Sequence, residues 1–444
     1  MLQQQERSLL QGSALVVDVK QKMKEIYAPK GFADSFPGLQ RMPDTQLTML
    51  TLENPSTQAL RKLLPEFEHR SGIRIKLIGV PYDDLLAQLN LIGPHFTYDM
   101  IRIDVAQFGD IGQTIYRPLD ELSISPEGLS PRLIKNGYDS YSMLNGRVYA
   151  LPLDPSVQIF LYRTDLFHDA KLCRAYYERF HENLVVPTTY EQYLHAAEFF
   201  TRSCNPDSPT EYGTTMTCGS ASVAASDFLP FYLSRIDRFG STPETLRLDC
   251  PEMQAAMRQY HALEKFSCKQ NWWGDSIQKF AEGKTAMTVI YSNYAAELIN
   301  SGNSVVVGRV GAAILPGCKP LLGGGIVGIS RYSQKAEACK QFFHWYYSAD
   351  VASLLVRLGG TSPIVDAYED FQNYSIFPWM NTSQKSFGLG QRGVINQTPE
   401  RFSIPKYEFA VGTAVRNVVQ DLMPPEDASR MAQALYDAAD PVCR

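Results

Sequence analysis

Residues 46–91 constrain the fold more than any other stretch, because strand-like and helix-like patterns alternate along them. Their order predicts strand, loop, helix, strand and helix, which is typical of an α/β sheet. A nucleotide-binding unit of this kind has glycines in its first loop, which let the backbone approach phosphates. The first loop here, residues 53–57, reads ENPST and contains no glycine. Ligands of open α/β sheets bind outside the carboxyl ends of the strands, so this polar loop favours a small, hydroxyl-rich ligand over a dinucleotide.

The helix after this loop is predicted from its apolar spacing and from the residues at its ends. Ser56 or Thr57 is expected to cap its start, Gly72 is expected to end it, and Pro65 is expected to kink it. A half-exposed strand over residues 73–77 follows. The apolar residues at helical spacing are Leu60, Leu63, Leu64 and Phe67.

The length of the chain predicts more than one compact part. A chain of 444 residues, 44% of them hydrophobic, exceeds the size at which single cores usually divide. We expect a lead-in over residues 1–45 and two lobes. The N-terminal lobe is predicted to contain residues 46–153 and about 324–367, and the C-terminal lobe residues 154–323 and about 368–444.

Charge and cysteine usage narrow the classes of partner. A net charge of −5 gives no general electrostatic reason to bind nucleic acid or an anionic membrane. Eight scattered cysteines show no zinc-ligand spacing, so no metal site is expected. The lead-in shows no signal peptide. The location therefore stays open between export with a signal missing from this sequence and the cytosol.

Further along the chain, several segments predict a continued α/β pattern. Residues 98–109 predict a third strand that ends at Asp104. Residues 144–163 predict an extended run that is interrupted at residues 153–156, which we interpret as a crossing between lobes. Residues 274–298 predict a helix, a glycine turn and a strand that ends in Tyr-Ser-Asn-Tyr. Helices are also predicted over residues 189–201, 251–266 and 335–347.

Three successive glycines, residues 323–325, precede a short apolar strand. The surrounding sequence matches no phosphate-binding loop, because neither Lys-Ser/Thr nor the G-x-G-x-x-G spacing leads into a helix. Gly323, Gly324 and Gly325 are therefore predicted to act as a hinge or to permit close backbone approach. Pro155 in the crossing segment is predicted to be part of the same hinge.

Six segments, in this order, carry a resemblance to a known family: TLENPSTQALRKLLPEFEHRSGIRIK, YDMIRID, LNGRVYALPLDPSVQIFLYRTDLF, FAEGKTAMTV, GGGIVGISRYSQKAEACKQFFHWYYS and GGTSP. They closely resemble the extracellular solute-binding proteins of bacterial carbohydrate ABC importers, the maltose-binding-protein-like group. The resemblance implies a two-lobed, periplasmic-binding-protein-like (type II) α/β fold with hinge crossings. It also implies that hinge closure on a mono- or oligosaccharide precedes delivery to an ABC permease. No cofactor and no nucleic-acid contact are implied, and a monomer is expected.

A second interpretation stays open at this point. Cytosolic relatives of these proteins follow a winged-helix DNA-binding domain of the GntR type, and residues 11–18, QGSALVVD, could form its last wing strand. The chain would then be the sugar-sensing effector domain of a transcriptional regulator.

Position by position, the resemblance places the ligand contacts at strand ends and in the crossing segment. Carboxylates and amides suit a sugar because charge-assisted bonds to hydroxyls are roughly twice as strong as neutral ones. The maltose-type Asp-Lys pair is Asn54-Pro55 here, so the identity of the sugar stays open. The predicted contacts are Glu53 and Asn54, Asp104, then Asp154, Ser156 and Gln158, and finally Ser292, Asn293 and Tyr294.

Aromatic side chains are candidates to cover the C–H faces of a sugar. At least one of Trp272 and Trp273 is predicted to stack on the ligand, with Trp273 as the site residue. Trp345 lies in the helical stripe FFHWYY and is predicted to be core. Arg392, in the glycine-rich segment GLGQRG, is a further candidate to clamp a ligand.

The sequence gives little support to catalysis. No G-x-S-x-G, H-E-x-x-H or metal-ligand cluster occurs, and the seven histidines are dispersed. Glu53 and Asp104 could serve as the paired carboxylates of a glycosidase, which is a minor alternative. We predict no enzyme. Replacing Asp104 or Asp154 by alanine is expected to abolish ligand-induced stabilisation while leaving the unliganded melting temperature nearly unchanged.

Overall fold

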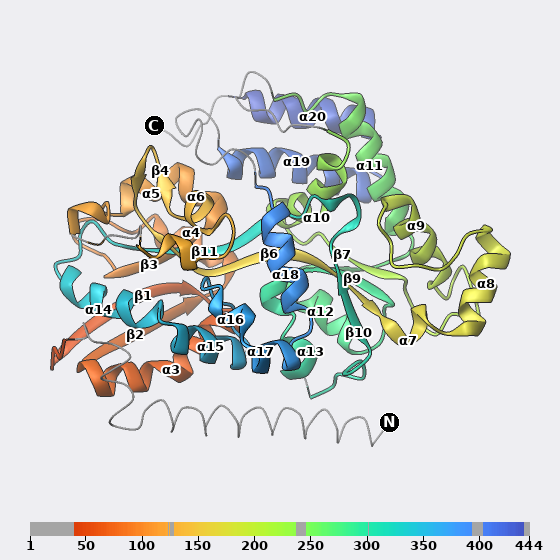
Figure 1. Cartoon of the computed structure of the whole chain (residues 1–444). Coiled ribbons are helices and arrows are strands. Elements are labelled where there is room, and N and C mark those ends of the chain that lie inside the picture. Colours follow the sequence, from red (N-terminus) through yellow and green to blue (C-terminus); the bar gives the residue numbers. More distant parts are fainter. Residues whose placement is uncertain are drawn as a thin grey trace. The chain divides into compact units, whose positions relative to one another are not determined.

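The computed structural model describes residues 40–122, 124, 128–236, 246–300, 302–392 and 403–438 (Figure 1). Most of the predicted lead-in, including the proposed wing strand at residues 11–18, lies outside these residues. The chain divides into two compact units. We call the described residues up to Val157 together with Leu322–Gly388 the N unit. The C unit contains Gln158–Leu321 and the described residues from Leu389 onward.

The N unit is built on a mixed sheet whose strand order is β6-β11-β3-β1-β2. β1 pairs in parallel with β2 and β3, whereas β11 runs antiparallel to β3 and β6. All five residues of β3 are buried, as expected for a strand covered on both faces. The bounds are β1 (Thr45–Leu52), β2 (Ile73–Val80), β3 (Met100–Asp104), β6 (Leu151–Arg163) and β11 (Leu322–Ile329).

Helices α3, α14 and α15 lie along the sheet of the N unit (Figure 1). The Phe67 and Trp345 rings meet with centroids 5.0 Å apart, and Trp345 is fully buried, which confirms its predicted place in the core. The N-unit helices are α3 (Pro55–Ser71), α4 (Tyr82–Leu89), α5 (Phe108–Ile115), α6 (Gly137–Tyr141), α14 (Ala336–Tyr346), α15 (Ala349–Arg357), α16 (Asp366–Glu369), α17 (Phe371–Ile376) and α18 (Met380–Leu389). Strands β4 (Met143–Leu144) and β5 (Arg147–Val148) form a hairpin.

The start of α3 differs from the prediction. The Asn54 side chain, not Ser56 or Thr57, caps the helix by accepting a hydrogen bond from the Thr57 backbone N–H at 2.8 Å. Proline at the first helical position suits this arrangement, because its fixed φ is helical and it has no N–H to satisfy. Gly72 ends the helix at φ 74°, as predicted.

In the C unit, the second half of β6 lies between β9 (Met287–Tyr291) and β10 (Val310–Ala313), and both run antiparallel to it. β7 (Thr214–Thr217) pairs in parallel with β8 (Ser267–Gln270). Helices α10, α11, α19 and α20 pack against one another on this unit. The C-unit helices are α7 (Thr164–Phe167), α8 (Ala170–Phe180), α9 (Tyr190–Phe199), α10 (Ala221–Leu233), α11 (Pro251–Glu264), α12 (Trp273–Ala281), α13 (Glu297–Asn300), α19 (Ile404–Val419) and α20 (Pro425–Asp437).

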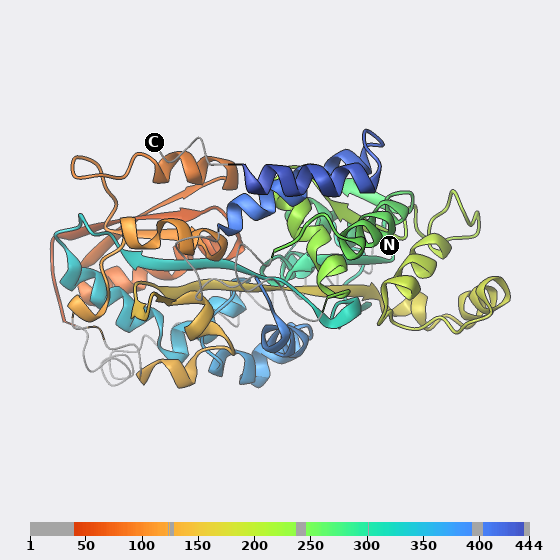
Figure 2. The same ribbon diagram turned by 90° about the horizontal axis from the view of Figure 1, so that it is seen from above.

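The extended run predicted over residues 144–163 is not broken where the sequence analysis placed an interruption. β6 continues through that position as one strand (Figure 2). The register shifts there, because Gly325 pairs with Asp154 whereas Ile326 pairs with Pro152. Leu153 is therefore the extra residue of a β-bulge.

The chain passes between the units after residues 157, 321 and 388. The third passage lies further along than the predicted boundary near residue 367, so α16, α17 and most of α18 are part of the N unit. A buried arginine accounts for this. Arg357 donates to the Asn373 side-chain oxygen at 2.9 Å and pairs with Asp370 at 3.1 Å, which ties α17 to α15.

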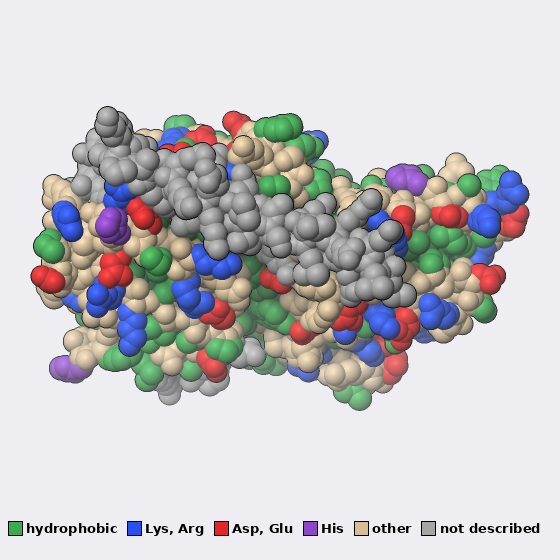
Figure 3. Space-filling model, turned by 90° about the horizontal axis from the view of Figure 1, so that it is seen from below, with side chains coloured by type: hydrophobic (Ala, Val, Ile, Leu, Met, Phe, Trp, Pro, Cys, Tyr) green, Lys and Arg blue, Asp and Glu red, His purple; other side chains and the backbone are tan. Residues whose placement is uncertain are grey.

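Within the described part of the chain, no helix is long and apolar enough to cross a bilayer. On the face drawn in Figure 3, the described Lys and Arg side chains alternate with Asp and Glu. This mixture agrees with the small net charge, and the described side chains of that face form no extended basic surface.

Candidate functional site

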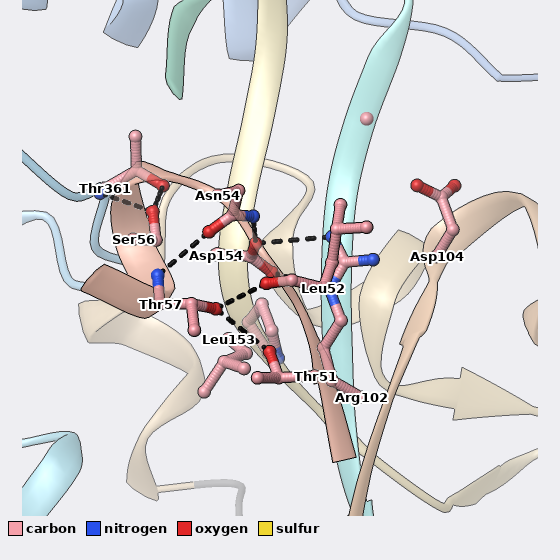
Figure 4. Close-up of polar contacts among 12 residues, drawn as sticks. Thr51, Leu52, Asn54, Ser56, Thr57, Arg102, Asp104, Leu153, Asp154 and Thr361 are labelled. Carbon is pink, nitrogen blue, oxygen red and sulfur yellow. Dashed lines mark hydrogen bonds and ion pairs between the residues drawn. The ribbon is translucent and has the colours of Figure 1, made fainter. Parts of the chain in front are cut away.

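A buried ion pair lies at the centre of the polar groups in the N unit (Figure 4). Arg102 donates from Nε and Nη2 to the two carboxylate oxygens of Asp154 at 3.1 and 3.2 Å. Asn54 donates its Nδ2–H to the same carboxylate at 2.5 Å. Both charged side chains are no more than 2% exposed. Asp154 therefore has its charge balanced and both oxygens bonded within the N unit.

A glycine makes room for this pair. A Cβ at Gly325 would lie 1.9 Å from Arg102 Nε and 2.4 Å from an Asp154 carboxylate oxygen. A Cβ at Gly324, whose φ is +84°, would lie 2.1 Å from the Asp154 carbonyl oxygen. These distances confirm the close-approach interpretation of these two glycines. The hinge role of Pro155, Gly323, Gly324 and Gly325 stays a prediction.

The polar loop after β1 turns most of its side chains inward. Ser56 accepts a hydrogen bond from the Thr361 backbone N–H at 3.0 Å, and the two hydroxyls lie 3.2 Å apart. Thr57 donates its hydroxyl to the Leu52 carbonyl at 2.6 Å. Asn54, Ser56 and Thr57 are all at most 4% exposed. The loop is thus held by its own hydroxyls and amide.

Glu53 is the exception in this loop, because its side chain is 37% exposed. It pairs with Arg61 at 2.9 Å, and this hydrogen bond raises the pKa of the Arg61 guanidinium. A Cβ at Gly79 would lie 2.2 Å from a Glu53 carboxylate oxygen, so the side chain also packs over the backbone of β2.

Asp104 ends β3, as the sequence predicted, and is 8% exposed. One of its oxygens accepts a hydrogen bond from the Ala106 N–H at 3.0 Å and so caps the short 3-10 helix Val105–Gln107. Figure 4 shows Asp104 on a strand beside the Asp154 cluster, with its carboxylate directed away from that cluster. A carboxylate has about four acceptor positions, and this capping bond uses one of them.

The crossing residues Ser156 and Gln158 are buried in different units. Ser156 is 1% exposed, and its carbonyl accepts a hydrogen bond from the Tyr141 hydroxyl at 3.3 Å. Gln158 is fully buried, and its amide bonds to the backbone of Leu321 and Ser226. In this structure, the hydrogen bonds of both residues therefore hold the crossing strands to neighbouring segments.

In the C unit, four predicted side chains gather where β9 ends. Ser292, Asn293 and Tyr294 form a 3-10 turn directly after the strand, and each is at most 7% exposed. Trp273 is 3% exposed and packs edge-on against Tyr291 with centroids 5.1 Å apart. This packing makes Trp273 part of the interior.

The neighbouring Trp272 has a different environment. It is only partly buried, and its indole N–H donates to the Tyr294 hydroxyl at 2.9 Å. The two rings lie edge to face at 6.2 Å. Of the two tryptophans considered, Trp272 is therefore the more exposed.

Arg392 lies in the same part of the C unit. It donates to the Tyr291 hydroxyl at 3.0 Å and pairs with Glu408 of α19 at 3.1 Å, and both charged side chains are almost fully buried. The guanidinium charge is balanced by a carboxylate that the sequence analysis did not single out. Arg392 therefore connects the end of β9 to α19 through these two interactions.

A buried carboxyl group in the C unit was also missed. Asp227 on α10 accepts hydrogen bonds from the Tyr260 hydroxyl at 2.6 Å and from the Thr217 backbone N–H at 3.2 Å. Burial raises the pKa of Asp227 to about 7, although both bonds oppose this shift.

The structure brings together Asn54 and Asp154 in the N unit, and Trp272 with Tyr294 in the C unit. Arg102 was not predicted, although an arginine between the apolar residues of the short strand MIRID is itself a signal that a buried partner exists. Among the described residues, no group of three or more His, Cys, Asp or Glu side chains could hold a metal ion.

A family model described as "bacterial extracellular solute-binding protein" matches residues 62–378, which is more than half of the chain. The chain belongs to this family. Proteins of this family bind solutes and are not enzymes.

Solved structures of solute-binding proteins share the fold. An ABC transporter solute-binding protein from Agrobacterium radiobacter K84, in complex with ribitol, has a TM-score of 0.76 at 21% identity, covering 89% of this chain and 98% of that one. A second solute-binding protein, from Agrobacterium vitis S4 with bound D-mannitol, has a TM-score of 0.71 at 19% identity. The similarity covers 88% of this chain and 97% of that one. Maltose-bound MalE3 of T. maritima has a TM-score of 0.71 at 19% identity, and the similarity covers 88% of this chain and 99% of that one. These similarities confirm the predicted two-lobed α/β fold class of solute-binding proteins.

Proposed function

We propose that this solute-binding protein captures a carbohydrate or a sugar alcohol for an ABC importer. The observation that carries the proposal is the family match over residues 62–378. The ligands bound in structures with the same fold support it. They include ribitol, D-mannitol, maltose and α-D-tagatose. All four are neutral and rich in hydroxyls.

The side chains of the two units support this ligand class. Asp104 supplies carboxylate oxygens at a strand end of the N unit, and such oxygens accept strong hydrogen bonds from hydroxyl groups. Trp272 supplies a partly exposed aromatic side chain in the C unit. The buried charges of Asp154 and Arg392 are balanced by Arg102 and Glu408, so neither of these pairs calls for a charged ligand.

We therefore propose two kinds of role for the predicted site residues. Asp104, Trp272, Asn293 and Tyr294 are direct ligand contacts. The others act through these contacts by holding the loops and strands in place: Glu53, Asn54, Asp154, Ser156, Gln158, Trp273 and Ser292.

A thermal-shift panel tests the ligand class. Ribitol, D-mannitol, maltose and D-tagatose are screened beside glycine and citrate as non-carbohydrate solutes. A true ligand at about 100 times its Kd stabilises the fold by about 2.7 kcal/mol. A flat response to every sugar and sugar alcohol, or a response to the amino acid alone, contradicts the proposal.

Two variants then test the contacts with whichever sugar responds. Asp104→Asn keeps the capping bond to Ala106, because asparagine caps helices as well as aspartate does. It is expected to keep the unliganded melting temperature and to weaken binding about tenfold or more, since a charge-assisted bond becomes neutral. Trp272→Ala is expected to weaken binding similarly. Glu121→Gln, at an exposed position outside the predicted site, is the matched control, and isothermal titration gives all three affinities.

We further propose that the protein acts as a monomer and passes its ligand to an ABC permease. Sedimentation velocity with and without the bound sugar checks the oligomeric state. Delivery is checked by sugar uptake into vesicles that contain the permease, which is expected to require the wild-type chain.

A further inference from the structure

A buried carboxyl group in the C unit holds the carboxyl end of β7, and that end supports the segment that carries Trp272. The group is Asp227 of α10. Resting on the proposed function, in which Trp272 contacts the ligand, we propose that Asp227 is a positioning residue for Trp272 and that its charge couples ligand affinity to pH. On this account Asp227 acts through the chain between it and Trp272 and is not itself a ligand contact.

Two side chains fix Thr217, the last residue of β7. Its backbone N–H donates to Asp227 Oδ2 at 3.2 Å, and its hydroxyl lies 2.7 Å from the Ser276 hydroxyl of α12. The Tyr260 hydroxyl of α11 donates to the same Asp227 oxygen at 2.6 Å. Thr217 is fully buried, so its polar groups depend on these partners. The end of β7 is thus tied to α10, α11 and α12.

The end of β7 is also in backbone contact with the segment before Trp272. β7 and β8 run parallel, so their carboxyl ends lie side by side. The Cys218 N–H continues the pairing beyond β7 by donating to the Gln270 carbonyl at 2.9 Å. Gly219 then packs on the next residue, because a Cβ there would lie 2.4 Å from the Asn271 carbonyl oxygen and 2.7 Å from its Cα. Asn271 directly precedes Trp272, so a displacement at the end of β7 is passed on to that side chain.

The titratable side chains that face Asp227 stay neutral near neutral pH, because burial raises the pKa of each. They are Tyr190 and Tyr193 of α9, Tyr260 of α11 and Cys218 after β7. The charged side chains of this region act on these neutral groups and do not shift the pKa of Asp227. They are Arg235, Glu264, Lys269 and Arg416. Burial raises the pKa of Asp227 itself to about 7, so its own charge changes near neutral pH.

The charged form of Asp227 holds Thr217 more firmly than the neutral form does, because a hydrogen bond to an ionised acceptor is roughly twice as strong as a neutral one. Acidification below about pH 7 neutralises the carboxyl group and loosens the end of β7. Trp272 is then placed less firmly. Ligand affinity is therefore expected to fall roughly two- to tenfold from about pH 8 to about pH 6.

The stability of the ligand-free protein is expected to change in the opposite direction. The raised pKa of Asp227 means that the folded protein binds this proton more tightly than the unfolded chain does, so protonation favours folding. Acidification over this range therefore stabilises the ligand-free protein while it weakens ligand binding. A purely structural role, in which affinity follows stability, predicts two changes of the same sign.

Affinity and stability measured over the same pH range test the proposal. Isothermal titration at about pH 6, 7 and 8 uses whichever of ribitol, D-mannitol, maltose or D-tagatose responds in the thermal-shift panel. Urea unfolding at the same pH values gives the stability of the ligand-free protein. An affinity that is independent of pH, or that rises on acidification, overturns the proposal.

Three variants separate the positioning role from a general loss of packing. Asp227→Asn is permanently neutral, and at all three pH values it is expected to bind as weakly as the wild type does at about pH 6. Ser276→Ala loses the other bond to Thr217 and is expected to lower the affinity but to keep its pH dependence. Tyr193→Phe is the matched control, because it loses a buried bond of 2.5 Å to Thr214 at the other end of β7, and it is expected to keep the wild-type affinity at each pH. A wild-type pH profile in Asp227→Asn, or an equal loss of affinity in Tyr193→Phe, overturns the positioning role.

Nuclear magnetic resonance of the ligand-free protein tests the link to Trp272 directly. The indole N–H of Trp272, which donates to the Tyr294 hydroxyl, is expected to change its chemical shift with a midpoint near pH 7 in the wild type and not in Asp227→Asn. An indole resonance that does not titrate overturns the proposal. Because this measurement uses no ligand, a flat sugar panel together with a titrating resonance removes the sugar and keeps the positioning role. A positive panel with a resonance that does not titrate does the reverse.

Discussion

Arg102 and Asp154 lose their hydration when they are buried and gain an ion pair with each other in its place. The net effect on stability depends on the difference between these two free energies. A buried ion pair often adds little net stability relative to apolar residues of the same size. Removing one partner is a different matter, because it leaves an uncompensated charge in a site that is no more than 2% exposed. Asp154 is therefore a structural anchor first, and we propose that it affects ligand binding through Asn54, which caps α3.

Asp154→Ala is expected to lower the free energy of unfolding by about 3–5 kcal/mol. This reverses the expectation from sequence that the unliganded protein would be nearly unaffected. Urea denaturation monitored by circular dichroism measures the change. Glu121→Ala, which removes an exposed partner of Arg147, is the control and is expected to cost at most about 1 kcal/mol. Equal losses in the two variants would argue against a structural role for Asp154.

Asp227 makes stability depend on pH. Burial raises its pKa to about 7 in the folded state. Between the ordinary carboxyl pKa near 4 and about 7, the folded protein therefore holds a proton that the unfolded chain has lost, so stability falls as pH rises through this window. Asp227→Asn is expected to flatten this slope between pH 4.5 and about 7 in urea titrations. Asp207→Asn, an exposed control, is expected to keep the wild-type slope; a steep slope in Asp227→Asn would show that another group causes it.

The sequence placed Asp104 correctly at a strand end, because that position follows from a local pattern. It placed Asp154 at the start of the C-terminal lobe, whereas the structure has it in the N unit. It did not reveal that Asp154 is paired, since Arg102 lies 52 residues away and only the sheet brings the two together. The same limit applies to Arg392, whose partner Glu408 lies on a helix beyond a stretch outside the described residues. Local sequence patterns identify candidate ligand-binding residues. Contacts between distant parts of the chain determine which of these side chains are already paired within the protein.

At the scale of elements, β6 and β11 form a ribbon whose close contact depends on two glycines. Gly325→Ala is expected to destabilise the protein by about 1–3 kcal/mol, because the new methyl group would overlap Arg102 and force the ion pair apart. Thermal and urea unfolding measure the loss. Gly93→Ala is the control, since nothing lies within 4 Å of a Cβ there. Equal stability in the two variants would mean that the ribbon tolerates a wider spacing.

Helices and strands with strong periodicity were predicted well. The predicted helices at residues 189–201, 251–266 and 335–347 appear as Tyr190–Phe199, Pro251–Glu264 and Ala336–Tyr346. The bulge at Leu153 was read as an interruption, because a polar Asp-Pro-Ser run looks like a turn when its strand partner is unknown. Register, and with it the bulge, is set by β11, which lies more than 150 residues further along the chain.

At the scale of the whole molecule, each unit is assembled from separate segments of the chain. The N unit needs its second segment, because β11 pairs with both β3 and β6, and the buried Trp345 of α14 packs on Phe67 of α3. Neither segment alone can complete the sheet or bury this core.

A chain of residues 40–157 alone is therefore expected to stay largely unfolded, whereas residues 40–157 joined to 322–388 by a short glycine-serine linker are expected to fold. A short linker suffices because Val157 and Leu322 are neighbouring strand partners. Circular dichroism and cooperative urea unfolding distinguish the two chains. Cooperative folding of residues 40–157 without the second segment would contradict this account.

The third connection between the units, at residues 388–389, offers a site at which a reporter domain can be inserted. Residues 388–390, Gly-Leu-Gly, follow Phe387, whose carbonyl accepts a hydrogen bond from the Asn136 side chain, and precede Gln391, whose N–H donates to the Pro320 carbonyl. Leu389 is 39% exposed. Small, exposed connecting residues are where inserted domains are best tolerated. A circularly permuted fluorescent protein inserted after Leu389 would have its two ends attached to different units, so its emission would report binding. The same short segment that joins the two units would then make the protein a genetically encoded sensor.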